Sequence, residues 1–317
     1  MRIVGIQRST TFSPGRHADN DRLILEATSR VLQRHGCSVD LMAEEDVGRV
    51  AISASAVFSM CQGSRANQIL QGIESDGALI INPPAAAMAC HRARLYHRLG
   101  QDRGVMVPTI LVATQGEHGI PSAFRGKGSL WVKRGDVHAT QRGDVVRVLG
   151  EEEYRATLRD FCQRGISEAT VERHLEGEVV KFYGVVDSPF FRFYSESDCK
   201  ICPVTFAAAR PGIEQVVRRL GLEVYGGDAV VTSAGVVVID VNDWPSFANF
   251  RAEAAEVIGN HIYRRAANHS IRQRLREYSG YSIGVEVPDP EGTCPVISSS
   301  PSTYEPGLRA AGSTDAR

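Results

Sequence analysis

The sequence predicts an α/β protein in which two or three small domains share a cleft. At 317 residues the chain is longer than a single hydrophobic core usually requires. Up to residue 105, short apolar segments alternate with amphipathic ones, which is typical of a parallel sheet covered by helices. From Pro108 the chain changes to closely spaced strand-like segments with glycine-containing loops, which indicates a second kind of domain.

Residues 1–105 are expected to form the parallel α/β layer. Arg2–Gln7 alternates like a short buried strand, and the amphipathic segment Asp21–His35, followed by Gly36, predicts a helix. Further apolar runs predict strands at Ser38–Met42, at Val57–Cys61 and in the segment GALIINPP. One helix is expected to follow in AAAMACHRARLYHRLG.

The region after Pro108 is predicted to contain more strands than helices. Strand-like segments are ILVAT, SLWVK and VVRVL, and the helix predicted after them, Glu151–Arg164, has an acidic first turn that suits the helix dipole. Later strands are predicted at Ala169–Leu175, Val179–Val185 and Phe190–Ser195, and later helices at Gly212–Leu220 and about Ala248–Ala267. Residues 287–317 are rich in Pro, Ser, Gly and Thr, which predicts a flexible tail.

Composition limits the classes of partner. The net charge is -1, with 36 basic and 37 acidic side chains, so the basic surface that nucleic-acid binding requires is not expected. The start MRIVGIQRST lacks the apolar stretch of a signal peptide, and no run of about 18 apolar residues predicts a membrane span. Seven scattered cysteines are typical of reduced thiols. We therefore expect a cytoplasmic protein.

Lysine is scarce, because almost every basic residue is arginine. The lysines are Lys127, Lys133, Lys181 and Lys200. A compact ammonium and a planar guanidinium are not interchangeable at a phosphate. Each remaining lysine is therefore a candidate for a position at which arginine would not serve.

The segment from Asp228 to Trp244 predicts a hairpin with an acidic face. If Ser233–Gly235 form a three-residue turn, Asp228 lies directly opposite Asp240, and Asn242, two residues along, shares their face. Two carboxylates and an amide oxygen suit Mg²⁺, which takes one or two protein carboxylates and completes its shell with phosphates and water. The alternative is a solvated hairpin face, but the run VVVID is too apolar for an exposed strand.

The string VIDVNDWPSF resembles the last β-hairpin motif of the ATP-grasp superfamily. That resemblance implies that Asp228, Asp240 and Asn242 hold one or two Mg²⁺ ions against the phosphates of ATP. The string LWVKRG resembles the family's central strand, which implies that Lys133 touches adenine and the α-phosphate. Lys181 falls where several branches of the family carry a basic residue that reaches the phosphates.

The segment VERHLEGEVVKFYGV resembles the acidic hinge that holds the nucleoside in this family. The resemblance implies that Glu172 accepts a hydrogen bond from the adenine amino group and that the Leu175 backbone meets the ring edge. It also implies that Glu178 or Glu176 holds the ribose.

The resemblance covers residues 1–265 and implies a domain plan. A Rossmann-like pre-ATP-grasp domain occupies 1–105, and the two lobes of the ATP-grasp domain occupy 106–178 and 179–286, the second with the metal-binding hairpin. The segment NPPAAAMACHRARLYHRLGQDRGVMVPT resembles the family's entry into the grasp, but the usual Asp-Lys at the helix start is missing. Arg92 or Arg94 is the candidate replacement, although a guanidinium contacts phosphate differently.

Four further residues are candidates for contact with substrate or phosphate. His138 lies in the glycine-poor loop RGDVHATQRGD and is either an aid to phosphoryl transfer or a solvated side chain. Ser246 stands where most ligases of the family have glycine and is expected to line the acceptor side. Arg192 and Arg210 are candidates for bidentate binding of carboxylate or phosphate, against ordinary surface positions.

The resemblance implies an ATP- and Mg²⁺-dependent carboxylate–amine ligase that forms an amide through an acyl phosphate. Its partners would be a small carboxylate and an amine, and the homodimers common in the family extend to this chain as an expectation. The nearest alternative is a small-molecule kinase, because inositol-phosphate kinases share an Ile-Asp-x-Asn motif that residues 239–242 match. A non-catalytic ATP-binding regulator is the third alternative, and the retained Asp228, Asp240 and Asn242 argue against it.

Overall fold

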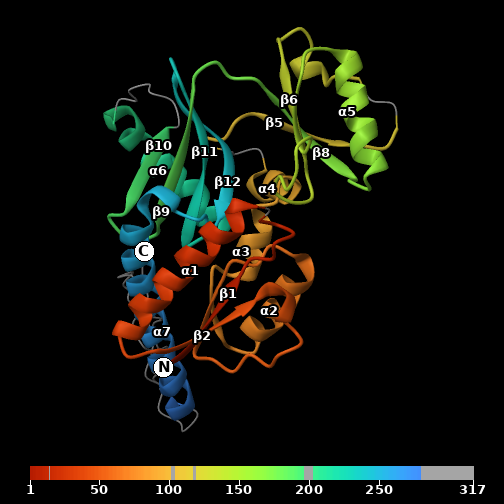
Figure 1. Ribbon diagram of the computed structural model, residues 1–317. Helices are drawn as coiled ribbons and strands as arrows, with labels where there is room; N and C mark the ends of the chain where they lie inside the picture. Colours follow the sequence, from red (N-terminus) through yellow and green to blue (C-terminus); the bar gives the residue numbers. More distant parts are fainter. Residues whose placement is uncertain (14, 101–103, 117–118, 196–202, 280–317) are drawn as a thin grey trace, which may run out of the picture. The chain divides into compact units, whose positions relative to one another are not determined.

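The structure is a computed structural model that describes residues 1–13, 15–100, 104–116, 119–195 and 203–279. Residues Met1–Gln273 form one compact unit, and its described residues include three four-stranded sheets (Figure 1). Arg274–Arg317 form a second unit, of which residues 274–279 are described as the end of helix α7. The tail predicted at 287–317 lies outside the described residues.

The first sheet is parallel, with the strand order β2-β1-β3-β4. Its strands are β1 (Arg2–Gln7), β2 (Ser38–Ala43), β3 (Ala56–Ser59) and β4 (Leu79–Ile81). Apolar residues of β1 and β3 pack on one face with helices α1 (Arg16–Arg34) and α7 (Arg251–Ser279), and on the other with α2 (Ser64–Ser75). The parallel α/β layer predicted for this region is confirmed.

The single helix predicted after Pro84 is wrong, because the chain forms two. Helix α3 spans Pro84–Ala89, α4 spans Arg92–Leu99, and His91 between them has extended backbone. The break between α3 and α4 is stabilised by a distant part of the chain, because the Ala93 amide donates to the Gly135 carbonyl at 2.9 Å. This second start places Arg92 in the wall of the cavity described below.

The second sheet is antiparallel, with the strand order β5-β8-β6-β7. Its strands are β5 (Thr109–Ala113), β6 (Leu130–Arg134), β7 (Val145–Val148) and β8 (Glu168–Arg173). Val132 and Val171 pack in one core with helix α5 (Glu151–Gln163). Because side chains alternate along a strand, Lys133 and Glu172 face away from that core.

The third sheet is also antiparallel, with the order β10-β9-β11-β12. Its strands are β9 (Glu178–Val185), β10 (Phe191–Ser195), β11 (Val224–Thr232) and β12 (Gly235–Asp243). Helix α6 (Pro203–Leu220) packs on one face through Phe206 and Ile213. It begins earlier than the predicted start at Gly212 and continues through Pro211, because these apolar side chains bury on the sheet.

The β11–β12 hairpin has the predicted pairing of Asp228 with Asp240, but a different turn. Thr232 pairs with Gly235, so the turn has two residues instead of three. A bulge at Ile239 then restores the predicted register. Ala229 pairs with Val238 and Asp228 pairs with Asp240, so Ile239 between them has no partner residue. Ile239 and Asp240 consequently both line the cavity.

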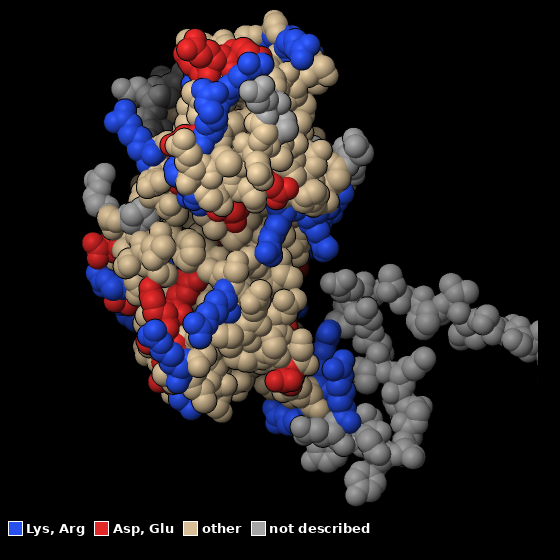
Figure 2. All heavy atoms as spheres, turned by 90° about the vertical axis from the view of Figure 1, so that its right-hand side faces the viewer, with Lys and Arg blue, Asp and Glu red and all other residues tan. Residues whose placement is uncertain are grey.

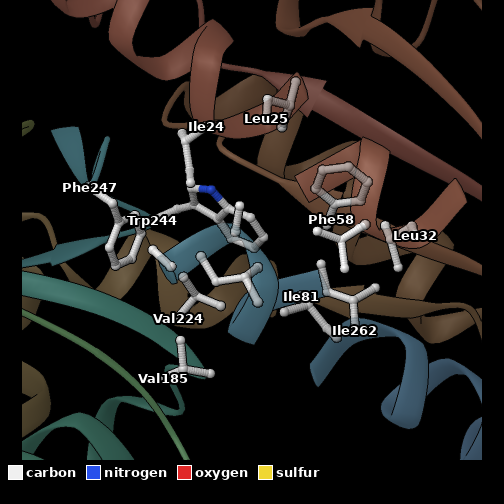
Figure 3. Packing of buried hydrophobic residues seen from close by; sticks show 14 of the residues in the cluster. Ile24, Leu25, Leu32, Phe58, Ile81, Val185, Val224, Trp244, Phe247 and Ile262 are labelled. Carbon is white, nitrogen blue, oxygen red and sulfur yellow. The ribbon is translucent and has the colours of Figure 1, made fainter. Parts of the chain in front are cut away.

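The hairpin leads into a buried aromatic core that fixes its end. Trp244 and Phe247 are fully buried and have positive φ angles of 41° and 50°. Figure 3 shows the Trp244 indole among side chains of the first and third sheets, and its ring lies 5.8 Å from that of Phe58. Positive φ is costly for bulky residues and persists only where packing enforces it. The backbone after Asp243 is therefore held by its core.

Acidic and basic side chains are interspersed on the face of the molecule that Figure 2 shows. This agrees with the net charge of -1. Among the described residues, every helix is too short or too polar to cross a membrane.

Candidate ATP and metal site

A cavity of about 780 Å³ collects side chains from the second and third sheets and from the loops after β1 and β3. The residues predicted from sequence that line it are Lys133, His138, Glu172, Leu175, Lys181, Asp228, Asp240, Asn242 and Ser246. Of the two arginines considered for the missing Asp-Lys, Arg92 lines the cavity and Arg94 is exposed.

Lys133 joins the two antiparallel sheets at this cavity. Its Nζ lies 2.6 Å from Glu172 Oε2, and both side chains are 7% exposed. The same ammonium donates to the carbonyl of Ile239 at 3.0 Å. Ile239 is the bulged residue, so the bulge supplies a carbonyl that Lys133 binds. The second and third sheets thus meet at one buried cation.

The two carboxylates predicted to hold metal each have a cationic partner. Lys181 Nζ lies 3.2 Å from Asp228 Oδ1, and Arg92 Nη2 donates to Asp240 Oδ2 at 2.6 Å. Burial raises the pKa of Asp228, an effect that Lys181 opposes. Burial alone would also raise the pKa of Asp240, but the charges of Arg92, His138 and Lys133 and the hydrogen bond from Arg92 together outweigh it and lower that pKa below its ordinary value. Asp240 is therefore ionised at neutral pH.

The cavity presents oxygen atoms of the kind that bind a hard metal ion. Among the described residues, no three His, Cys, Asp or Glu side chains form a group that holds a metal by itself. Asp240 Oδ1 is, however, buried without a hydrogen-bond partner, which is costly unless a ligand completes it. Two carboxylates and the Asn242 amide fit Mg²⁺ when phosphate and water supply its other ligands. Asp228, Asp240 and Asn242 are the residues that would hold it.

The loop between β6 and β7 covers part of the cavity and contains His138. His138 is 8% exposed, so the alternative of a solvated side chain is wrong. Burial and, against the opposing charge of Asp240, the charge of Arg92 lower the pKa of His138 to about 3, so the ring is neutral at pH 7. Both ring nitrogens are buried without a hydrogen-bond partner.

Several predicted residues lie outside the cavity wall. Glu176 is 93% exposed and is 3.3 Å from His174, and Glu178 contacts Ser195 of the neighbouring strand β10. Arg192 pairs with Glu253 at 3.1 Å, and Arg210 lies within helix α6, where it pairs with Glu214 at 2.7 Å. The roles predicted for these four residues and for Arg94 find no support in these positions.

Sequence reasoning missed other parts of the wall. Trp131 is one of the wall residues that were missed. It lies two residues before Lys133 on β6, and this spacing predicts that the two side chains share a face of the strand. Its indole donates to His174 Nδ1 at 3.1 Å. Asp243 lines the cavity, and burial raises its pKa to about 6. Arg8, Ser13 and Gln62 come from the loops after β1 and β3, and Asp21 comes from helix α1; no local pattern marks them.

Comparisons with known proteins identify the fold. No protein-family model matches the sequence, and no curated protein matches it. Among solved structures, D-alanine–D-alanine ligase from Bacillus anthracis complexed with ATP superimposes with a TM-score of 0.64 at 14% identity, covering 87% of this chain and 99% of that one. D-alanine–D-alanine ligase from Coxiella burnetii gives 0.63 at 12% identity, covering 89% and 100%.

A RimK domain protein, described as ATP-grasp, from Sphaerobacter thermophilus gives a TM-score of 0.58 at 17% identity. It covers 82% of this chain and 99% of that one. The fold that the hairpin and central-strand motifs resembled is thereby confirmed. The chain has the fold of the ATP-grasp superfamily.

Proposed function

We propose that this protein is an ATP-dependent carboxylate–amine ligase that forms an amide bond on a small molecule or peptide. The observation that carries the proposal is one cavity containing the buried Lys133–Glu172 pair and, on β11 and β12, the opposed carboxylates Asp228 and Asp240. The names of its structural neighbours support it, since they are ligases, one of them complexed with ATP.

The adenine ring would lie among apolar side chains of the two antiparallel sheets. Those that line the cavity are Trp131, Val145, Leu175, Val179, Val230 and Ile239. Glu172, whose Oε2 lies 2.6 Å from Lys133 Nζ, would accept from the exocyclic amine. Lys133 carries the positive charge for the α-phosphate. Apolar walls with a few fixed polar groups are the usual form of a nucleotide site.

The phosphates would lie at Asp228, Asp240 and Asn242. Mg²⁺ held there would neutralise charge on the transferred phosphoryl group. Lys181 is 45% exposed in its contact with Asp228, so its flexible chain can turn to a phosphate oxygen. Arg92 is 7% exposed and is held more firmly.

The chemistry requires positioning more than a protein nucleophile. A substrate carboxylate oxygen attacks the γ-phosphorus, ADP leaves, and an acyl phosphate forms. The amine nitrogen then attacks the acyl carbon, inorganic phosphate leaves, and the nitrogen loses a proton. His138 and Asp240 are buried, and this limited access of bulk solvent would slow hydrolysis of the acyl phosphate.

A coupled assay for ADP and free phosphate tests the proposal. The enzyme is supplied with Mg-ATP and either a pool of amino acids or a pool of polyols and inositol phosphates. ADP and phosphate released together, only with amino acids, are the expected result. ADP without phosphate in the second pool would instead establish a kinase, which the aspartate at position 240 favours. Binding of ATP without turnover in either pool would indicate the regulator.

A further inference from the structure

Asp243 at the end of β12 is a buried carboxylate with an oxygen that nothing in the described structure satisfies. It is 1% exposed and lines the cavity. Its Oδ1 accepts a long hydrogen bond of 3.3 Å from Gln62 Nε2, whereas Oδ2 has no partner. Gln62 Oε1 is likewise buried and unpartnered. Two adjacent side chains therefore present acceptors for which the described residues supply no donor.

The orientation of the Gln62 amide is consistent with this assignment. Exchanging its oxygen and nitrogen would place Oε1 against Asp243 Oδ1, and two acceptors in contact repel each other. The amide nitrogen therefore faces Asp243, and the amide oxygen remains as the second acceptor.

The cations nearby bond to other groups, although the Nε atoms of Arg8 and Arg92 are buried without a hydrogen-bond partner. Arg8 donates through Nη1 to Asp21 at 2.8 Å and through Nη2 to the backbone carbonyls of Asp243 and Trp244 at 3.3 and 2.9 Å. Arg92 pairs with Asp240 at 2.6 Å. His138 Nε2 lies 3.9 Å from Asp243 Oδ1, which is too long for a hydrogen bond. Within the described residues, the Asp243 carboxylate has no cation in hydrogen-bond contact.

The backbone holds Asp243 in this position. Arg8 donates hydrogen bonds to the backbone carbonyls of Asp243 and Trp244. Trp244 is fully buried and has a positive φ of 41°. A strained residue persists only where its surroundings enforce it, and such residues concentrate at binding sites. The fold thus holds the Asp243 carboxylate in a buried position, where an unpaired charge is energetically unfavourable.

We propose that Asp243 and Gln62 form the subsite for the primary ammonium group of an α-amino acid whose carboxylate the enzyme activates. This inference rests on the proposed function and names its substrate class. An ammonium has three donors and a positive charge, which complement two acceptors and one negative charge. It is a spectator in the reaction, because a protonated amine bound by a carboxylate is not a nucleophile.

The position of Asp243 also limits the length of the substrate. Its Oδ1 lies 3.9 Å from Nε2 of His138, and Arg92, which bonds to Asp240, also donates to the carbonyl of Val137, the residue next to His138. The ammonium would therefore lie within a few ångströms of the phosphate end of the cavity. That span suits an amino group on the carbon next to the carboxylate better than one at the end of a long chain.

Binding and turnover together test the subsite. Isothermal titration calorimetry with the non-hydrolysable analogue AMPPNP and Mg²⁺ present would compare individual α-amino acids with their N-acetyl and α-hydroxy counterparts. Asp243→Asn keeps the shape of the side chain and removes its charge. Asp19→Asn, on an exposed side chain of α1, is the matched control.

We expect an amino acid to bind the wild type and its N-acetyl and α-hydroxy counterparts to bind at least about 10-fold more weakly. Asp243→Asn should weaken the amino acid about 10- to 100-fold, as expected for loss of a hydrogen bond to a charged group, and leave AMPPNP affinity within about twofold. Unchanged AMPPNP affinity also shows that the variant is folded. Gln62→Leu should cause a smaller loss.

Equal binding of amino acid and α-hydroxy acid, or an unchanged affinity in Asp243→Asn, would overturn the subsite whether or not the protein is a ligase. Amino-acid binding that depends on Asp243, without release of ADP and phosphate, would retain the subsite and reject the ligase. The two proposals can therefore fail separately.

Discussion

The loop between β6 and β7 depends on the buried carboxylate of Asp144. This side chain is inaccessible to solvent and accepts hydrogen bonds from the amides of Thr140 and Gln141 at 2.8 and 3.1 Å. It also pairs with Arg134 at 3.1 Å and with Arg164. Asp144→Asn would remove the negative charge that pairs with both guanidinium groups. It would also place the new amide nitrogen against a donor, either Arg164 or the two backbone amides.

The free-energy cost of Asp144→Asn follows from the burial of the Asp144 side chain. Breaking a buried ion pair by removing one partner costs about 3 to 5 kcal/mol, and the lower figure applies because the two arginines are 14% and 23% exposed. About 3 kcal/mol corresponds to a change of about 100-fold in an opening equilibrium. Asp136→Asn is the matched control, because Asp136 binds the same Arg134 but is 42% exposed. An exposed pair contributes about 1 kcal/mol or less.

Hydrogen exchange measures the local free energy of opening directly. We expect the Thr140 and Gln141 amides to lose about 100-fold in protection in Asp144→Asn and less than about fivefold in Asp136→Asn. Similar losses in the two variants would refute the reasoning, since they would show that burial of Asp144 adds nothing.

The pH dependence of this effect has a definite sign. Burial alone would raise the pKa of Asp144, but the two amides and the two arginines outweigh it and hold the pKa well below its usual range. A depressed folded-state pKa gives a stabilisation that is complete above the unfolded pKa of about 3.9 and is lost as the pH falls below it. The difference between wild type and Asp144→Asn should therefore be constant from pH 7 to about 5 and shrink below about 4.

Three further predictions concern the cavity. Lys133→Ala should weaken AMPPNP binding at least about 10-fold by calorimetry, and Lys133→Arg should not restore it, because a larger guanidinium does not fit 2.6 Å from buried Glu172. Asp240→Asn should raise the Mg²⁺ concentration for half-maximal ADP release by at least about 10-fold, whereas an unchanged requirement would remove Asp240 from the metal site. Arg192→Ala should leave ADP release within about twofold, because Arg192 pairs with Glu253 away from the cavity; a tenfold loss would restore its substrate role.

Much of the cavity wall follows from strand periodicity. The alternation that places Val132 in the α5 core predicts that Lys133 faces the other way, and the structure agrees. The same rule argues against Glu178, which cannot share a face with Lys181 three residues later on β9. Val179 and Lys181 line the cavity, and Glu178 instead contacts Ser195. The ribose contact that the motif resemblance implies for Glu178 or Glu176 stays a prediction, and strand periodicity argues against Glu178.

The hairpin register was predicted correctly through two compensating differences. Local turn chemistry allowed three residues at Ser233–Gly235, whereas the chain uses two and recovers the register with a bulge at Ile239. A bulge leaves no mark in an apolar run such as VVVID, because any of its residues fits a buried strand. The contact between Lys133 and the Ile239 carbonyl was for this reason invisible in the sequence.

The contribution of the first sheet to the cavity could not be predicted by local patterns. Arg8 contacts the carbonyl of Trp244, which lies 236 residues away along the chain. Gln62 reaches Asp243 across 181 residues. Polar residues in the loops after β1 and β3 have no periodicity that separates a cavity wall from a solvated turn. Only the packing of the whole unit places them.

Different cations lie beside the two carboxylates that we propose as metal ligands, which gives a reason for the lysine in a chain that otherwise uses arginine. Arg92 is 7% exposed, and besides Asp240 it donates to the Val137 carbonyl at 3.4 Å, so it is held in place. It binds one oxygen of Asp240 and leaves Oδ1 for a metal. Lys181, at 45% exposure, holds Asp228 with a flexible ammonium that can leave it for a phosphate. A fixed guanidinium therefore orients one carboxylate, while a mobile ammonium can follow the charge of the nucleotide.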